Sequence, residues 1–420
     1  MVSKLFLFRT ITTVAVSTIA AAIFYTYPQT MIVAFLTSHN NRTDFAQTMR
    51  DNSLTSYNNS SDSIPSFLSA VRHGHWVRFQ PSTEKLEELT SFHTHIRHTV
   101  YALPRSLQRP DAKCGNTTIS STNMASRKFR ALCDPAGPTP CCYDNQCVNR
   151  TVSQCACAQC VDARTDDLHA DFAHYVMSDT GHQLTPFTSH RAICDVMSNT
   201  TLLFYGDSLT SHVYLALLTK TLGGNMSRLF APNTPEAEKQ KCQGQRMYVM
   251  TCRQWMKDVW QFPGCDAPGK MSAVLTYRDV NKQHLRDSVQ RLVKTPNSVL
   301  YVGIGLHQDF DISYVNSTVV QTILEVKGES RWPYVIYAGN HHWGILRNPD
   351  FVTTKEAAVE KFNQELQALL SQYGMTYFDT YEMTRKVFSY DGTHYAYGVN
   401  QVKADILLNV IHRLKHEPVS

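Results

Sequence analysis

The sequence predicts a three-layer α/β/α sandwich in the second half of the chain, and two observations carry this prediction. From residue 199 onward, short apolar runs alternate with segments of helical periodicity. The apolar runs are hydrophobic at consecutive positions, which is typical of strands buried on both faces of a parallel sheet. Helices are then expected to cover both faces of that sheet.

Five apolar runs are predicted strands, and three periodic segments are predicted helices. The strands are residues 202–205, 273–277, 299–302, 334–338 and 375–378. The helices cover residues 285–293, 359–370 and 402–411. Gly374 is a predicted helix C-cap, because glycine readily adopts the left-handed conformation needed there.

The N-terminus has the pattern of a membrane anchor. Residues 10–38 contain no charge, and about 20 apolar residues suffice to span a bilayer. Lys4 and Arg9 precede this run, so we expect a cytosolic tail at 1–9, a span at 10–36 and a lumenal body. The alternative is a secreted protein whose signal peptide is cleaved near residues 20–22.

Residues 37–68 are rich in Ser, Asn, Thr and Asp and predict a flexible, glycosylated stem. Eight Asn-x-Ser/Thr acceptor sites, which are used only in the secretory pathway, agree with a lumenal body. They are Asn41, Asn58, Asn59, Asn116, Asn149, Asn199, Asn225 and Asn316. Net charge is +5 with no basic run, so nucleic-acid binding is not expected.

The chain has 12 cysteines, and eight of them lie between Cys114 and Cys160. In an oxidising compartment this density predicts disulfides, whose pairing the sequence leaves open. The alternative is a zinc site at Cys155-x-Cys157-x-x-Cys160, and we expect no metal. We divide the body into a cysteine-rich subdomain at 69–195 and a catalytic domain at 196–420.

Two distant motifs suggest one catalytic site. Gly206-Asp207-Ser208 ends a predicted strand, and open α/β sheets bind ligands at the carboxyl ends of their strands. Ser208 needs a base to become a nucleophile, and His394 offers one, since the unperturbed pKa of the histidine side chain lies near neutrality. Asp391, three residues earlier, can orient the imidazole. The alternatives are that Asp207 or Ser208 merely caps the helix, and that a backbone carbonyl orients His394.

These motifs resemble the PC-esterase branch of the SGNH/GDSL superfamily. That branch includes plant trichome-birefringence-like O-acetyltransferases, the animal sialic-acid O-acetyltransferase and neurexophilin/PC-esterase domain proteins. Tyr277-Arg278, Gly305-Leu306-His307 and Gly74-His75-Trp76-Val77 extend the resemblance to about residues 70–415. It implies an SGNH-hydrolase-like sandwich with Ser208, Asp391 and His394 as the catalytic residues. The cysteine that the plant family has just before Gly74 is missing.

The resemblance also implies an oxyanion hole with a glycine and an asparagine on separate loops. The segment Gly303-Ile304-Gly305-Leu306-His307 lacks that asparagine, so the Gly305 N–H or the His307 side chain is our candidate substitute. His341, His342 and Trp343 follow a predicted strand and, with Arg278, are candidate substrate contacts. The alternatives are an ordinary rim loop and a local ion pair of Arg278.

We therefore expect a Golgi-membrane enzyme that moves an acyl group, most simply acetyl, onto or off a glycan or glycoconjugate. A sugar hydroxyl would resolve the acyl-enzyme in a transferase, and water in an esterase; the sequence does not separate the two. No resident cofactor is expected, and the acyl donor stays open, with acetyl-CoA as one candidate. The alternative is a non-catalytic glycan- or protein-binding module on the same fold.

Overall fold

The computed structural model describes residues 63–124, 127–164, 168–178, 181–256, 261, 265, 269–350 and 356–416. These residues belong to one compact unit, Ser60–Ser420. The predicted tail, the predicted span and most of the predicted stem lie outside the described residues. Among the helices that the structure describes, none has the length and apolar character needed to cross a membrane.

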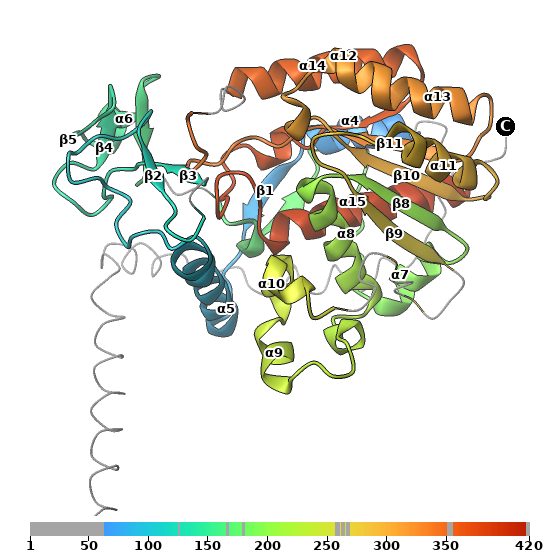
Figure 1. Cartoon of the computed structure of the whole chain (residues 1–420), viewed down its shortest axis with the longest axis horizontal. Coiled ribbons are helices and arrows are strands. Elements are labelled where there is room, and N and C mark those ends of the chain that lie inside the picture. The colour runs from blue at the N-terminus through green and yellow to red at the C-terminus, as the bar shows by residue number, and fades with distance from the viewer. Residues whose placement is uncertain are drawn as a thin grey trace, which may run out of the picture. The chain divides into compact units, whose positions relative to one another are not determined.

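The sheet of the α/β part has five parallel strands in the order β12-β11-β10-β8-β9. Their bounds are β8 Thr201–Gly206, β9 Lys270–Leu275, β10 Ser298–Gly303, β11 Tyr334–Ala338 and β12 Thr376–Phe378. All five predicted strands are present, which confirms the α/β class with a parallel sheet. Figure 1 shows this sheet in the middle of the α/β part, with β10 at its centre and β8 between β10 and β9.

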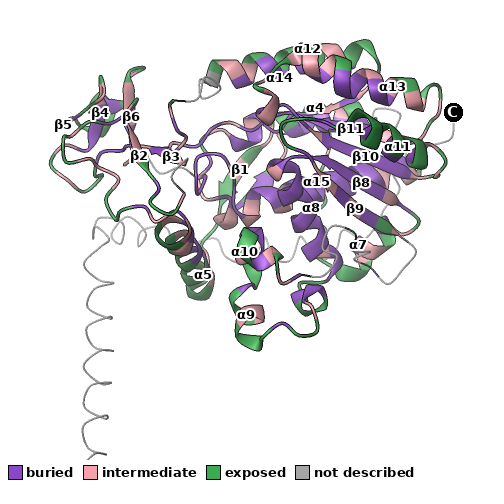
Figure 2. Cartoon of the chain, viewed as in Figure 1, coloured by how far each residue is buried: buried purple, intermediate pink, exposed green. Residues whose placement is uncertain are grey.

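Helices cover both faces of the sheet. Leu202 and Phe204 of β8 enter one hydrophobic cluster, whereas Leu203 and Tyr205 enter another, because successive strand residues point to opposite faces. The first cluster packs α4 Ile64–Arg72, α7 His190–Met197, α8 Ser208–Thr221 and α15 Tyr397–His416. The second packs α11 Lys282–Val293, α13 Gln321–Lys327 and α14 Glu356–Gln372. The buried sheet between these two helical layers is visible in Figure 2.

The ends of two helices show how local chemistry sets the boundaries. Gly374 has φ +62°, and α14 ends two residues earlier, so the predicted C-cap is confirmed. The predicted stem is wrong at its C-terminal end. There Ser63 caps α4, and Ile64, Phe67 and Leu68 of this helix are buried in the core. Its apolar spacing was hidden by the polar composition of the preceding residues.

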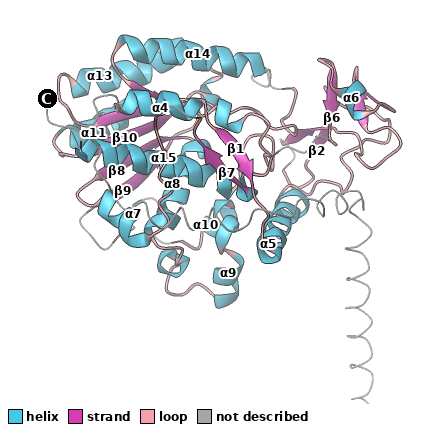
Figure 3. Cartoon of the chain, turned by 180° about the vertical axis from the view of Figure 1, so that it is seen from behind, coloured by secondary structure: helices cyan, strands magenta, loops and turns pink. Residues whose placement is uncertain are grey.

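Short strands, short helices and the loops between them make up the rest of the described chain (Figure 3). The strands form three small antiparallel sheets: β1 His75–Arg78 with β7 Ala173–Val176, β2 Thr118–Ser120 with β3 Lys128–Arg130, and β4 Cys141–Tyr143 with β5 Gln146–Val148 and β6 Cys160–Asp162. The further α-helices are α5 Thr83–Thr94, α6 Val152–Cys155, α9 Glu236–Lys241, α10 Met250–Arg253 and α12 Ile312–Tyr314. The 3₁₀- and π-helices are η1 His95–Val100, η2 Ala170–Phe172, η3 Met226–Leu229, η4 Gly244–Tyr248, η6 Leu306–Gln308, η7 Val315–Val320 and η9 Glu382–Thr384.

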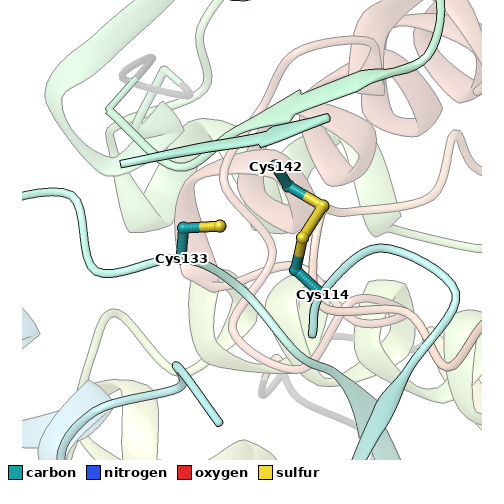
Figure 4. A group of neighbouring side chains, drawn as sticks. All are labelled: Cys114, Cys133 and Cys142. Atoms are coloured by element: carbon teal, nitrogen blue, oxygen red, sulfur yellow. A yellow bond between two sulfur atoms is a disulfide. The ribbon is translucent and has the colours of Figure 1, made fainter. Parts of the chain in front are cut away.

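All 12 cysteines are paired, so the predicted disulfides are confirmed. The pairs are Cys114–Cys142, Cys133–Cys147, Cys141–Cys155, Cys157–Cys160, Cys194–Cys265 and Cys242–Cys252. Figure 4 shows the sulfur of Cys133 beside the Cys114–Cys142 bridge, a grouping close enough for a metal site. Because each of these sulfurs is bonded to another, none is a thiolate that could bind zinc.

Candidate active site

Ser208 lies where the central strand β8 passes into helix α8. Gly206 is the last strand residue, and a Cβ there would lie 2.3 Å from both the Gly303 carbonyl oxygen and Thr210 Oγ1. Only glycine fits this approach. Asp207 is the helix N-cap, and its Oδ1 accepts the Leu209 N–H at 2.9 Å. The cap role therefore belongs to Asp207, which leaves the Ser208 hydroxyl for another partner.

His394 is supplied by a tight loop between η9 and α15. Asp391 Oδ1 accepts the backbone N–H of Thr393 at 2.9 Å and that of His394 at 2.7 Å. Gly392 has φ +81°, and a Cβ there would lie 2.1 Å from the Arg347 backbone nitrogen. The turn therefore requires the glycine of the Asp-Gly-Thr-His motif, and it fixes the imidazole relative to the carboxylate.

The structure brings the three predicted catalytic residues into one hydrogen-bonded relay. His394 Nε2 lies 2.8 Å from Ser208 Oγ, across 186 residues of sequence. His394 Nδ1 lies 2.8 Å from Asp391 Oδ2. The His394 side chain is 12% exposed and that of Asp391 1%, so the base is reachable from solvent while the acid is buried. This is the geometry that a nucleophile, a base and an orienting acid require.

The pKa values of the two carboxylates in the site, Asp391 and Asp207, are shifted in opposite directions. Burial raises the pKa of Asp391, but the charges and hydrogen bonds of His394 and Arg127 outweigh it and hold this pKa well below its ordinary value. Burial raises the pKa of Asp207 to about 6, even though backbone N–H groups and His394 act against it. Asp391 is thus ionised throughout the range in which a histidine base works.

Three contacts of the relay were not predicted. Tyr101 and Arg127, both from the cysteine-rich segment, bind Asp391 Oδ2 at 2.8 and 3.2 Å. The ring of His212, one helical turn after Ser208, lies 5.0 Å from that of His394 between centroids. The i, i+4 spacing of Ser208 and His212 is a local signal that could have indicated this neighbour. No local pattern indicates Tyr101 or Arg127.

The two candidate oxyanion donors, the Gly305 N–H and the His307 side chain, lie in different surroundings. The Gly305 N–H already donates to Gln308 Oε1 at 3.0 Å. The His307 side chain is half-buried, and burial followed by the proximity of His394 lowers its pKa. Asn340 supplies an amide that the sequence did not assign: its Nδ2 lies next to Gly305, and it lines a cavity of about 10 Å³ with Asp207 and Leu209.

The predicted substrate contacts divide into exposed and buried groups. Arg278 is exposed, and His342 is half-buried. His341 is 4% exposed, and its Nε2 contacts Lys403 Nζ. Trp343 is 7% exposed, and the Arg347 guanidinium lies 4.4 Å from the centre of its ring. His341 and Trp343 are therefore buried, whereas Arg278 and His342 retain exposed surface.

Packing explains why the loop after β11 turns inward. The indole of Trp343 joins a small apolar cluster that links the start of α8 to α14; its other buried members are Leu209, Leu306, Val359 and Tyr381. His341, which belongs to the same loop, lies next to the fully buried Lys403 of α15. An aromatic side chain after a strand can bind a ligand or fill the core, and here the apolar neighbours decide for the core.

No protein-family model matches this chain, and no curated protein matches it. The solved structures that are similar to it include the following three. A lipolytic G-D-S-L family protein from Veillonella parvula has TM-score 0.31 and 15% identity, covering 51% of this chain and 99% of its own. An inhibitor-bound M. smegmatis aryl esterase has TM-score 0.30 and 16% identity, covering 52% of this chain and 99% of its own. A carbohydrate acetylesterase from Sinorhizobium meliloti has TM-score 0.30 and 12% identity, covering 51% of this chain and 99% of its own. We base the function on the geometry of the site rather than on these likenesses.

Proposed function

We propose that this protein is a serine acyl-transfer enzyme in which Ser208 is the nucleophile, His394 the general base and Asp391 the orienting acid. The single observation that carries the proposal is the continuous relay from Asp391 Oδ2 through the imidazole to Ser208 Oγ, with both contacts at 2.8 Å. A non-catalytic module has no need for a base at hydrogen-bond distance from a partly exposed hydroxyl.

The reaction follows from this geometry. As Ser208 Oγ attacks the carbonyl carbon of an acyl ester, its proton passes to His394 Nε2, and the carbonyl oxygen becomes an oxyanion. When the tetrahedral intermediate collapses, the bond to the leaving alcohol breaks, and the imidazolium returns the proton to that alcohol. A hydroxyl of water or of a sugar then loses its proton to His394 Nε2 and attacks the carbonyl carbon of the acyl-Ser208 ester. When this second tetrahedral intermediate collapses, the bond to Ser208 Oγ breaks, the imidazolium returns the proton to Oγ, and the acid or the acylated sugar leaves.

The oxyanion needs donors where its charge develops. Ser208 is the first residue of α8, so its backbone N–H belongs to the helix end that has no intrahelical acceptor. The helix dipole favours negative charge at the same point. His307 and the amide of Asn340 are the side chains that we propose as additional donors.

The substrate is proposed to be an acetylated glycan or a glycan acceptor, with the body of the chain in the Golgi lumen behind an N-terminal anchor. Six disulfides support an oxidising compartment. Among the described acceptor sites for N-glycosylation, the exposed asparagines are Asn116, Asn149, Asn199 and Asn225. The motif resemblance to glycan O-acetyltransferases supports the acyl group and the acceptor class. The proposed acyl donor is acetyl-CoA or an acetyl ester.

The full-length chain should release the chromophore of a chromogenic acetyl ester in a burst equal to the enzyme concentration, followed by a slower steady rate. The burst reports formation of the acyl-enzyme, and the slow phase its resolution. Adding a mixed glycan pool should speed the slow phase and yield acetylated glycan by mass spectrometry if the enzyme is a transferase. Acetate as the sole product would indicate an esterase. Folded protein with neither burst nor turnover would favour a binding module.

A further inference from the structure

The buried carboxylate of Asp391 is held from two sides. Its Oδ1 accepts two backbone N–H groups of its own loop. Its Oδ2 faces His394 Nδ1 at 2.8 Å, accepts the Tyr101 hydroxyl at 2.8 Å and accepts Arg127 Nη1 at 3.2 Å. A carboxylate offers about four lone-pair sites, so these donors occupy it fully.

Tyr101 and Arg127 form a supported pair of their own. The Arg127 guanidinium bonds the Tyr101 hydroxyl and lies 4.8 Å from the centre of its ring. The Tyr101 ring is 6% exposed and packs on Phe129 of β3 with 4.9 Å between centroids. Arg127 directly precedes β3, so this short strand presents both the charge and the surface on which the tyrosine packs.

The cysteine-rich subdomain also contacts the backbone beside the loop that carries Asp391 and His394. The Arg130 N–H of β3 donates to the Leu346 carbonyl at 3.1 Å. Two residues before Leu346, the Gly344 N–H donates to the Gly392 carbonyl at 3.1 Å. Arg347, the residue after Leu346, donates from Nη1 to Thr393 Oγ1 at 2.6 Å. β3 is therefore connected to the Asp391–His394 turn through backbone and side chains.

We propose that Tyr101 and Arg127 are positioning residues that hold Asp391 ionised and oriented toward His394. The inference rests on the proposed function, because it assigns a role within the same relay. A charge buried to this degree is costly unless it is paired and hydrogen-bonded. Within the α/β part, the loop's own N–H groups and His394 Nδ1 contact this carboxylate. Tyr101 and Arg127 of the cysteine-rich subdomain add two further contacts to Oδ2.

Several other titratable groups face the relay, and all of them stay in place when Arg127 is changed. They are Asp207 and His212 at the start of α8, Arg253 of α10, His307 of η6, His341 and Arg347 after β11, Tyr390 of the catalytic loop and Lys403 of α15. Removing the Arg127 cation alone favours the protonated imidazole, since one positive neighbour is lost. The acid limb of the pH–rate profile should then move to higher pH.

The test compares Arg127→Gln, Arg127→Lys and Tyr101→Phe in the full-length chain. Arg127→Gln should lower kcat by about 10- to 100-fold, a part of what general acid–base catalysis contributes, with KM changed far less. Its acid limb should move upward, whereas Arg127→Lys, which keeps the charge, should hold the limb near the wild-type position. Lys128→Gln is the matched control: it makes the same charge change one residue later, at a side chain paired with Asp350 at 2.8 Å, and should behave as wild type.

A spectroscopic readout separates this inference from the proposed function. The proton between His394 Nδ1 and Asp391 should give a far-downfield NMR resonance, assigned by its loss in His394→Gln. The resonance should shift in Arg127→Gln and Tyr101→Phe but not in Lys128→Gln. Equal melting curves and an unchanged disulfide count confirm that each variant folds.

The outcomes are distinguishable. If the resonance responds as expected but the wild-type chain turns over no ester, the positioning role stands and the proposed function falls. If the wild-type chain is active while Arg127→Gln and Tyr101→Phe leave the pH profile and the resonance unchanged, the positioning role is overturned and the function stands. A wild-type chain without the resonance would also overturn the positioning role, because Asp391 would then not hold the imidazole.

Discussion

Replacing Ser208 by alanine is expected to lower kcat for an acetyl ester by about 10⁶-fold, the scale on which loss of a serine nucleophile acts in a hydrolase relay. Without Oγ there is no covalent route, and His394 Nε2 loses the group that lies 2.8 Å away. The burst phase should disappear entirely. The fold should be unaffected, because Asp207 rather than Ser208 caps α8.

The matched control for this variant is Ser211→Ala. Ser211 lies on the same helix, and its hydroxyl donates to the Ser208 carbonyl at 2.9 Å. We expect it to keep turnover within about tenfold of wild type, since it removes no transition-state contact. Equal activity of Ser208→Ala and Ser211→Ala would remove Ser208 from the mechanism.

The second large effect is expected for Asp391→Asn, at about 10⁴-fold in kcat. The change keeps the shape of the side chain but removes the charge that stabilises the imidazolium. The new amide can also donate to His394 Nδ1, which would place the imidazole proton on Nε2, where it cannot accept the Ser208 proton. Stopped-flow kinetics measure the loss of turnover, and a melting curve measures whether the variant is still folded.

Asp350→Asn is the control for charge removal, because Asp350 is an exposed acid that pairs with Lys128. It should leave turnover unchanged. A loss smaller than about tenfold in Asp391→Asn would instead mean that a backbone carbonyl orients His394, since removal of a relay acid has a far larger effect.

Much of the fold was predictable because its signals are local. A strand buried on both faces must be apolar at consecutive positions, and residues 202–205 meet that condition within β8. Gly374 ends a helix by a conformation that few other residues adopt. The glycine-acid-serine turn and the distant Asp-x-x-His also predicted which three side chains meet, because Ser208 needs a base and the second motif offers one with an acid three residues before it.

The remaining features depend on contacts between distant segments. Tyr101 and Arg127 reach Asp391 across 290 and 264 residues, and no periodicity or motif relates them. The burial of Trp343 depends on α8 and α14, which its own neighbours in sequence do not reveal. The presence of disulfides followed from composition, whereas their pairing required the folded chain.

The central claim is that Ser208 carries the acyl group during turnover. The most direct measurement is to quench the full-length chain during the burst with a chromogenic acetyl ester and to locate the added acetyl group by peptide mass mapping. We predict one acetyl group per chain on Ser208, absent in Ser208→Ala and persistent in wild type only until the slow phase resolves it. Acetylation found solely on lysines or other serines, or none during measurable turnover, would contradict the account.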